Sequence, residues 1–306
     1  MSSPNGPASG LPVRMPPPRR SGRHRRPEPV VAPDGSPALV LAVPGTPGAD
    51  VRSLAEEIVS IARSELPGLD GRIGYLDGDD DEFPGLTTVL NQALEQRTAR
   101  YEQAKAAGVE VAEPEGPVAV VVPLLAGPHP TLLERIREAV AASEAQVELT
   151  DVLGPHPLLA EALHVRLSEA GLSRADRARL FTVATAADGI ILTSVGGADA
   201  VQAAGITGML LAARLAVPVM AAALDQEGAV AATADELRAA GSAQLALAPY
   251  LVGPEVDRAL LESAAKDAGC AAAEPLGAYP AIGKLALSQY ASVLGIKLPQ
   301  QGAPVR

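Results

Sequence analysis

The chain has 306 residues, enough for two lobes of ordinary size, and 47 % of them are hydrophobic. Its formal net charge is −11, aromatic residues make up only 2 %, and tryptophan is absent. An acidic body repels DNA and anionic membranes, and few aromatic side chains are available to stack on single-stranded nucleic acid. We therefore expect neither nucleic acid nor membrane as a partner. The one cysteine, Cys270, excludes an internal disulfide and a cysteine zinc cluster.

The N-terminal segment, residues 1–36, is rich in proline and arginine and has almost no apolar periodicity. Such a segment cannot bury enough surface to offset the entropy lost on ordering. Six arginines against two acidic residues give it a charge of about +4, which leaves about −15 on the remaining chain. It has no apolar signal region, so we expect a cytoplasmic protein. We predict a disordered tail, with a weak electrostatic docking arm as the alternative.

The rest of the chain alternates apolar strands with helices. Strands are predicted at residues 39–43, 72–76, 118–122, 147–149, 190–193, 217–222 and 244–247. Helices are predicted at residues 50–64, 86–107, from 130 onward, 158–170, from 197 to about 214, and 230–240. Apolar strands that alternate with helices through short loops are typical of doubly wound parallel sheets. The apolar stretch 206–223 contains Arg214 and Pro218, so we interpret it as a helix and a strand, not a membrane span.

Several phrases of the sequence occur twice in the same order. Aligning Pro123 with Pro249 places Leu125 on Leu251, Gly127 on Gly253, Pro128 on Pro254 and His129 on Glu255. The phrase Leu-Gly-X-X-Pro occurs at residues 153–157 and again at 276–280, each time between a strand and a helix. The sequence therefore predicts two tandem flavodoxin-like α/β lobes related by internal duplication, residues 37–172 and 173–306, with a cleft between them. Whether the lobes or the chains associate further is left open.

Ligands of doubly wound sheets bind beyond the carboxyl ends of the strands, so the loops there carry the candidate chemistry. The glycine turns at residues 45–48 and 196–197 lack the dinucleotide and Walker patterns. His129 and His156 both occur as Gly-Pro-His-Pro in such loops, where neutral imidazole can act as a metal ligand or a base. The alternative is that each is a loop histidine with no catalytic or metal-binding role. The acidic run 77–82 offers oxygen ligands or is simply a solvated loop.

Three phrases together resemble the class II tetrapyrrole chelatases, with the two-lobed sirohydrochlorin chelatases as the nearest type. They are Tyr75-Leu-Asp77 with the helix entry that begins at Pro84, the strand and loop 120–125, and the segment 151–159. The resemblance covers residues 38–295. It implies a lyase-type reaction that inserts Co²⁺ or Fe²⁺ into a tetrapyrrole in cobalamin or sirohaem biosynthesis. The divalent metal is then a substrate, and no organic cofactor is implied.

The resemblance implies that His129 is both the metal ligand and the catalytic base. His129 matches the family's second histidine if its loop is about two residues shorter than usual; otherwise Thr131 takes that place. The residues implied for binding the tetrapyrrole are Pro44, Gly45, Thr46, Asp77, Leu125, Gly127 and His156.

The chain departs from the family at its first histidine, which normally stands in a His-Gly-Ser/Thr phrase after the first strand. Here that phrase begins with Pro44, and the second lobe offers Val195 and Glu255 at the equivalent positions. A prolyl ring can neither ligate a metal nor accept a proton. We therefore expect reduced chelatase activity. The alternative is an inactive homologue that binds a tetrapyrrole or a metal, or that acts as an interaction or regulatory protein.

Overall fold

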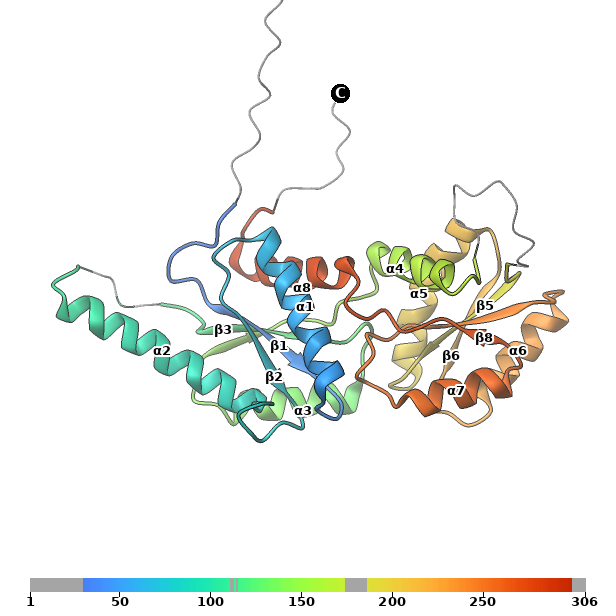
Figure 1. Ribbon diagram of the computed structural model, residues 1–306, viewed down its shortest axis with the longest axis horizontal. Helices are drawn as coiled ribbons and strands as arrows, with labels where there is room; N and C mark the ends of the chain where they lie inside the picture. The colour runs from blue at the N-terminus through green and yellow to red at the C-terminus, as the bar shows by residue number, and fades with distance from the viewer. Residues whose placement is uncertain (1–29, 111–112, 114, 174–185, 299–306) are drawn as a thin grey trace, which may run out of the picture.

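The computed structural model describes residues 30–110, 113, 115–173 and 186–298. Two four-stranded parallel sheets lie side by side along the longest axis of the molecule (Figure 1). The strand order is β2-β1-β3-β4 in the first sheet and β6-β5-β7-β8 in the second, so the two orders are equivalent. These sheets confirm the predicted pair of parallel α/β lobes. The predicted tail up to residue 29, part of the segment 108–116 and the connection 174–185 lie outside the described residues.

The central strands of both sheets are buried along their whole length, as expected for strands that are covered on both faces. The first half of the chain contains β1 (Ala38–Val43), α1 (Ala49–Glu65), β2 (Gly71–Tyr75), α2 (Leu86–Ala106), β3 (Ala119–Pro123), α3 (Pro130–Ala141), β4 (Val147–Leu149) and α4 (Pro157–Glu169). The second half contains β5 (Gly189–Ser194), α5 (Ala198–Leu215), β6 (Val219–Ala223), α6 (Ala229–Ala239), β7 (Leu245–Pro249), α7 (Arg258–Asp267), β8 (Ala271–Ala272) and α8 (Pro280–Leu294).

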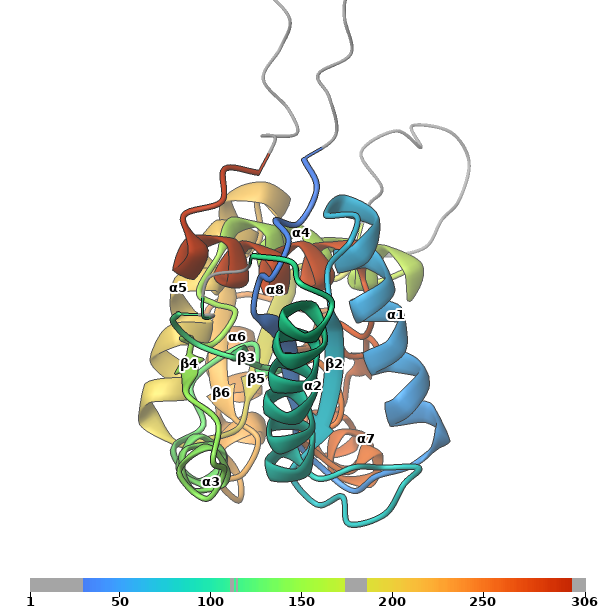
Figure 2. The same ribbon diagram turned by 90° about the vertical axis from the view of Figure 1, so that its left-hand side faces the viewer.

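Each sheet lies between two layers of helices, and the two halves of the chain exchange one helix. On the first sheet, α2 and α3 cover one face, whereas α1 and α8 cover the other (Figure 2). On the second sheet, α6 and α7 cover one face, whereas α4 and α5 cover the other (Figure 1). Helix α4 belongs to the first half of the chain and α8 to the second. The last helix of each half therefore packs on the sheet of the other half.

Equivalent side chains fasten the two exchanged helices. The guanidinium of Arg166 on α4 donates two hydrogen bonds to the Leu276 carbonyl, at 3.1 and 2.8 Å. Gln289, which lies at the same position of α8, donates to the Val152 carbonyl at 3.2 Å. As a result, one continuous hydrophobic core contains strand residues of both sheets, such as Leu41 and Leu192. The division of the chain between residues 172 and 173 stays a prediction.

The hydrogen bonds of the loops repeat between the halves and then diverge at one helix. The Leu153 amide donates to the Leu125 carbonyl at 3.0 Å, and in the second half the Leu276 amide donates to the Leu251 carbonyl at 2.9 Å. Helix α3 begins directly after His129, but α7 begins only after Asp257, whose carboxylate accepts a bond from the Ala259 amide at 2.9 Å. The repeat of strand, loop and helix is therefore offset by two residues at α7.

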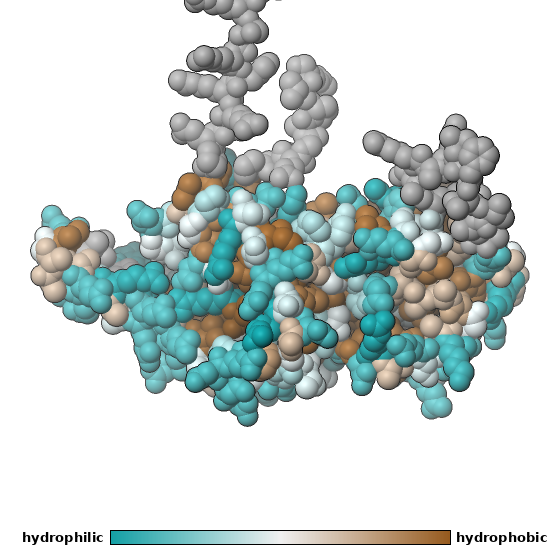
Figure 3. Space-filling view, in the orientation of Figure 1, coloured by the Kyte–Doolittle hydropathy of each residue, from teal (hydrophilic) through white to brown (hydrophobic). Residues whose placement is uncertain are grey.

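Three observations concern the outside of the molecule. Residues 30–37 lie against the first lobe, where the Ala32 amide donates to the Pro67 carbonyl at 2.9 Å. Hydrophilic residues predominate on the face shown in Figure 3, in particular over α2. Of the helices in the described ranges, none has the length and apolarity that crossing a membrane requires.

Candidate functional site

The two lobes touch where the loop after the first strand of one lobe meets the loop after the third strand of the other. Gly45 has a φ of +85°, and a Cβ atom at this residue would overlap the carbonyl of Pro254. Gly196 has a φ of +111°, and a Cβ atom there would lie 2.7 Å from the Pro128 carbonyl oxygen and 2.9 Å from the Cα of His129. Only glycine allows both the backbone angle and the close approach. The two contacts occupy equivalent places in the duplicated chain.

His129 is the first candidate for chemistry at these contacts. It is partly buried, and its Nδ1 caps α3 by accepting a long bond of 3.4 Å from the Leu132 amide. Burial lowers the pKa of His129, and the negative charge of Asp225 partly opposes that shift. The ring is therefore neutral near pH 7, the form that ligates metal ions and accepts protons. Because Nδ1 accepts a bond, the proton of the neutral ring sits on Nε2.

Asp225 is a candidate site residue that the sequence analysis did not name. It follows strand β6, and its Oδ2 accepts a bond of 2.9 Å from the Gly196 amide, the residue that also touches His129. The structure thus brings His129 of one lobe and Asp225 of the other to the same glycine. The signal in the sequence is Leu224-Asp225, which repeats the Leu76-Asp77 phrase at the end of the corresponding strand of the first half.

A hollow lies beside each of the two loop contacts. The hollow next to His129 has a volume of about 710 Å³, and its lining includes Thr131, Arg135 and Arg137 of α3 and Asp199 of α5. The equivalent hollow has a volume of about 540 Å³, and its lining includes Gly45, Thr46, Glu255 and Arg258. Both volumes lie in the range of small-molecule sites. Gly45 and Thr46 line the second hollow and therefore do not share a hollow with the loop of His129.

The acidic run after β2 is occupied by contacts with other parts of the first lobe. Asp77 forms an ion pair with Arg135 of α3, and Glu82 forms one with Arg52 of α1. The Asp80 carboxylate accepts a bond from the Phe83 amide at 2.6 Å. Among the described residues, no group of three or more histidine, cysteine, aspartate or glutamate side chains is placed to hold a metal ion. At this site the described side chains that could ligate a metal ion are the imidazole of His129 and the carboxylate of Asp225.

Three further residues implied by the resemblance lie in the interior. Pro44 is buried at the end of β1, and Leu125 is only 2 % exposed. A Cβ atom on Gly127 would lie 3.1 Å from the ring of Tyr250, a buried residue of the second lobe. Burial raises the pKa of Tyr250 to about 12, so its hydroxyl stays protonated and receives the bond from Thr207 at 3.2 Å. These residues shape the contact between the lobes.

Glu255, which occupies the place of His129 in the second half, is partly buried and turned back on its own loop. Its two carboxylate oxygens accept bonds from the Val252 and Gly253 amides at 2.9 and 2.6 Å. Burial raises the pKa of Glu255, and the backbone amides around it, including that of Ala126 in the first lobe, oppose this shift. Because these amides occupy its oxygens, Glu255 has a structural role in this arrangement.

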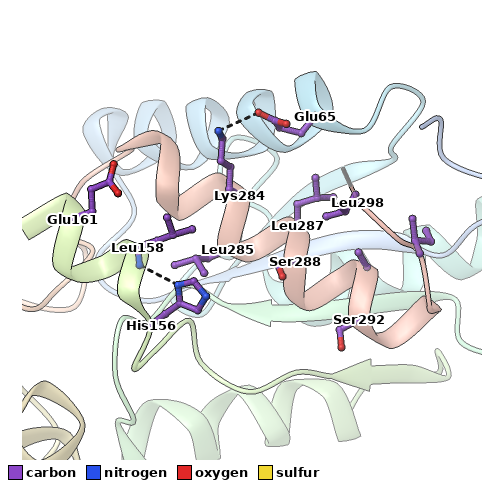
Figure 4. Close-up of a pocket in the computed structure, with 12 residues that line it drawn as sticks. Glu65, His156, Leu158, Glu161, Lys284, Leu285, Leu287, Ser288, Ser292 and Leu298 are labelled. Atoms are coloured by element: carbon purple, nitrogen blue, oxygen red, sulfur yellow. Dashed lines mark hydrogen bonds and ion pairs between the residues drawn. The ribbon is translucent and has the colours of Figure 1, made fainter. Parts of the chain in front are cut away.

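His156 lies at a different place in the molecule. It caps α4, where its Nδ1 accepts a bond of 3.1 Å from the Leu158 amide, and burial lowers the pKa of its ring. It lines a hollow of about 690 Å³ against α8, with Lys284 and Glu65 at the opposite side (Figure 4). No described residue lines both this hollow and the hollow beside His129.

The comparisons with known proteins agree with this architecture. No protein-family model matches the sequence, and no curated protein sequence matches it. The fold is similar to that of a solved structure described as CbiX, the terminal enzyme for biosynthesis of sirohaem in denitrifying bacteria, with a TM-score of 0.54 and 14 % sequence identity. The similarity covers 84 % of this chain and 99 % of that chain. It shows that the two-lobed fold is chelatase-like, as the resemblance implied.

Proposed function

We propose that this protein is a sirohydrochlorin chelatase-like enzyme that binds a tetrapyrrole in the hollow beside His129 and inserts Co²⁺ or Fe²⁺. The observation that carries the proposal is the position of His129: a neutral imidazole at the contact between two lobes of a chelatase-like fold, next to Asp225 of the opposite lobe. The activity is reduced because Pro44, which is buried, cannot supply the second imidazole.

Insertion of a divalent metal into a tetrapyrrole releases two protons from pyrrole nitrogens, so the site needs a metal ligand and an acceptor for each proton. A single imidazole takes up one proton, and the other passes to water. His129 can serve as either through Nε2, once its ring proton moves to Nδ1 and the cap on α3 opens. That cap costs little to open because a bond of 3.4 Å is weak. The carboxylate of Asp225 stabilises the imidazolium formed when His129 accepts a proton.

The hollow also suits the periphery of the substrate. Sirohydrochlorin carries carboxylate side chains around its ring, and guanidinium groups bind carboxylates with two parallel hydrogen bonds. Arg135 and Arg137 line the hollow and are partly exposed, each paired with one acidic residue of the first lobe. In this proposal the two arginines bind carboxylates of the macrocycle, in a hollow that Glu134, Glu138 and Asp199 also line.

The test is an anaerobic titration of sirohydrochlorin into the purified protein, followed by Co²⁺ or Fe²⁺, with absorbance recorded against a protein-free control. We expect a spectral change on binding and metallation faster than in the control. The variant His129→Ala should lose the acceleration, and the matched variant His156→Ala, another loop histidine that caps a helix, should keep it. Metallation that His129→Ala leaves unchanged would refute the assigned role of His129.

A second function is a carrier or sensor that binds the tetrapyrrole without metallating it. It is favoured by the fact that two acidic side chains already have partners: Asp77 is paired with Arg135, and Glu255 is bound by backbone amides. In the same titration, this function gives a spectral change on binding and a metallation rate equal to that of the control. Absence of any spectral change excludes both functions.

A further inference from the structure

The outward face of α5 is apolar and exposed. Ile206, Met209 and Leu210 are 42 %, 66 % and 41 % exposed, respectively, and form one stripe because they are spaced three and four residues apart. Ala213 continues the stripe by one turn, and no charged residue occurs between Asp199 and Arg214. Contiguous exposed apolar residues of this kind mark interaction surfaces in soluble proteins.

The duplication supplies an internal control for this surface. Gly48 and Gly197 precede α1 and α5, so the residues of the two helices can be aligned one by one. In α1, Glu57 stands in place of Ile206, Ser60 in place of Met209, and Ser64 in place of Ala213. Ile61 stands in place of Leu210, so three of the four stripe positions are polar in α1, although both helices cover equivalent sheets. The fold therefore does not require this stripe.

The sheet edge beside α5 is also less polar than the equivalent edge of the first sheet. β6 is the first strand in the order of the second sheet, and no strand among the described residues pairs with its outer edge. Its sequence is Val-Met-Ala-Ala-Ala, with the first three residues partly buried. The equivalent edge strand β2 carries Arg72, which is paired with Asp70, and a bridge joins Tyr75 to Gly85. Charges protect a sheet edge from association, and β6 has none.

We propose that the α5 face is the interface of a symmetric dimer, occupied by α5 of a second copy of this chain. A twofold axis through the middle of α5 runs the two helices antiparallel and buries the apolar stripe of both copies. Asp199 and Arg214 are each one residue from an end of α5, so the axis brings each Asp199 towards the Arg214 of the second copy. Arg214 also donates from Nε to His164 Nδ1 of its own chain at 2.8 Å, and Asp199 also lines the hollow beside His129. The dimer does not depend on the proposed chelatase function.

Charge selects a second copy over a membrane as the occupant. The body of the protein is acidic, and helices that lie on membranes carry lysine and arginine beside their apolar face. The stripe is uncharged along its length, so two copies of an acidic protein approach each other there with the least repulsion.

The first experiment is sedimentation velocity of the full chain over a concentration series. We expect a species of twice the chain mass of 31.1 kDa, and we expect the double variant Ile206→Glu with Met209→Ser, which copies the α1 residues, to be monomeric. The control Glu57→Ala with Ser60→Ala changes the equivalent positions of α1 and should still dimerise. Far-ultraviolet circular dichroism establishes that each variant is folded. A monomeric wild-type chain, or a dimer that survives the α5 substitutions, overturns the proposal.

A cross-linking experiment tests the axis itself. Ile206 lies next to the middle of α5, so Ile206→Cys in a Cys270→Ser background should form a disulfide between two copies under mild oxidation. Val293 of α8 is equally exposed, at 42 %, and Val293→Cys in the same background should stay monomeric on a non-reducing gel. Equal cross-linking of the two variants contradicts the proposed interface, and so does cross-linking at residue 293 alone.

Discussion

The two halves of this protein share a backbone and differ in what they place on it, most clearly at His129 and Glu255. Both residues follow the third strand of their sheet, and both loops touch a glycine of the opposite lobe. His129 keeps a neutral ring beside Asp225, with one weak bond to its own helix. Glu255 is bound by its own loop and helps to hold the lobes together. The duplication thus retained the contact, with the residue proposed for chemistry in one copy and a carboxylate bound by backbone amides in the other.

The largest effect is expected from breaking the close contact between the lobes. In Gly45→Ala the new Cβ meets the Pro254 carbonyl at a positive φ, so we expect a loss of about 3–4 kcal/mol in the free energy of unfolding. Gly228→Ala is the matched control, because Gly228 has a φ of +77° and open space around it, and it should cost about 1–2 kcal/mol. Urea unfolding measures both. Equal losses would mean that the contact contributes nothing.

The next effect concerns the histidine that only the first half carries. Removing a general base typically lowers a rate about 10²-fold or more, which is the loss we expect for metallation in His129→Ala. Because burial lowers the pKa of His129, the wild-type rate should persist as the pH falls through 6.5 and decline only below it. A pH series of the metallation rate checks this; a midpoint above 6.5 contradicts the assignment.

A smaller effect is expected from restoring the residue that both halves lack. Pro44→His introduces a second imidazole after β1, and one added ligand should raise the metallation rate about tenfold. The substitution also places a polar ring at a buried position, so thermal unfolding has to be recorded alongside the rate. A folded variant with an unchanged rate shows that more than this one residue separates the chain from a fully active chelatase.

The smallest effect is the pH dependence that Glu255 gives to stability. Its pKa is raised by burial, so the folded state holds a proton that the unfolded state releases. Its contribution is therefore fully present below the unfolded pKa near 4.5 and is lost as the pH rises through the folded pKa. Chemical unfolding at several pH values should show this decline in the wild type and a shallower one in Glu255→Gln. Identical slopes would remove Glu255 as its source.

The sequence predicted the sheets well because apolar strands, glycine loops and a repeated phrase are local signals. It could not predict the exchange of α4 and α8, because an apolar helix face fits either sheet and periodicity does not say which one. The candidate site stays a prediction. His129 was named from its loop, whereas Asp225 reaches it only through the contact of Gly196 with the other lobe. Likewise, the sequence does not show that Pro44 is buried or that the Glu255 carboxylate accepts bonds from amides of its own loop.

The exchange of helices also sets the order in which this chain can fold while it is being synthesised. The first sheet is complete once β4 has been made, but α8, which covers one of its faces together with α1, follows all four strands of the second sheet. Multidomain proteins usually fold one domain after another from the N-terminus. Here the part of this face that α8 covers stays open until the second sheet has been made. The growing chain therefore exposes this apolar surface while its second half is being synthesised.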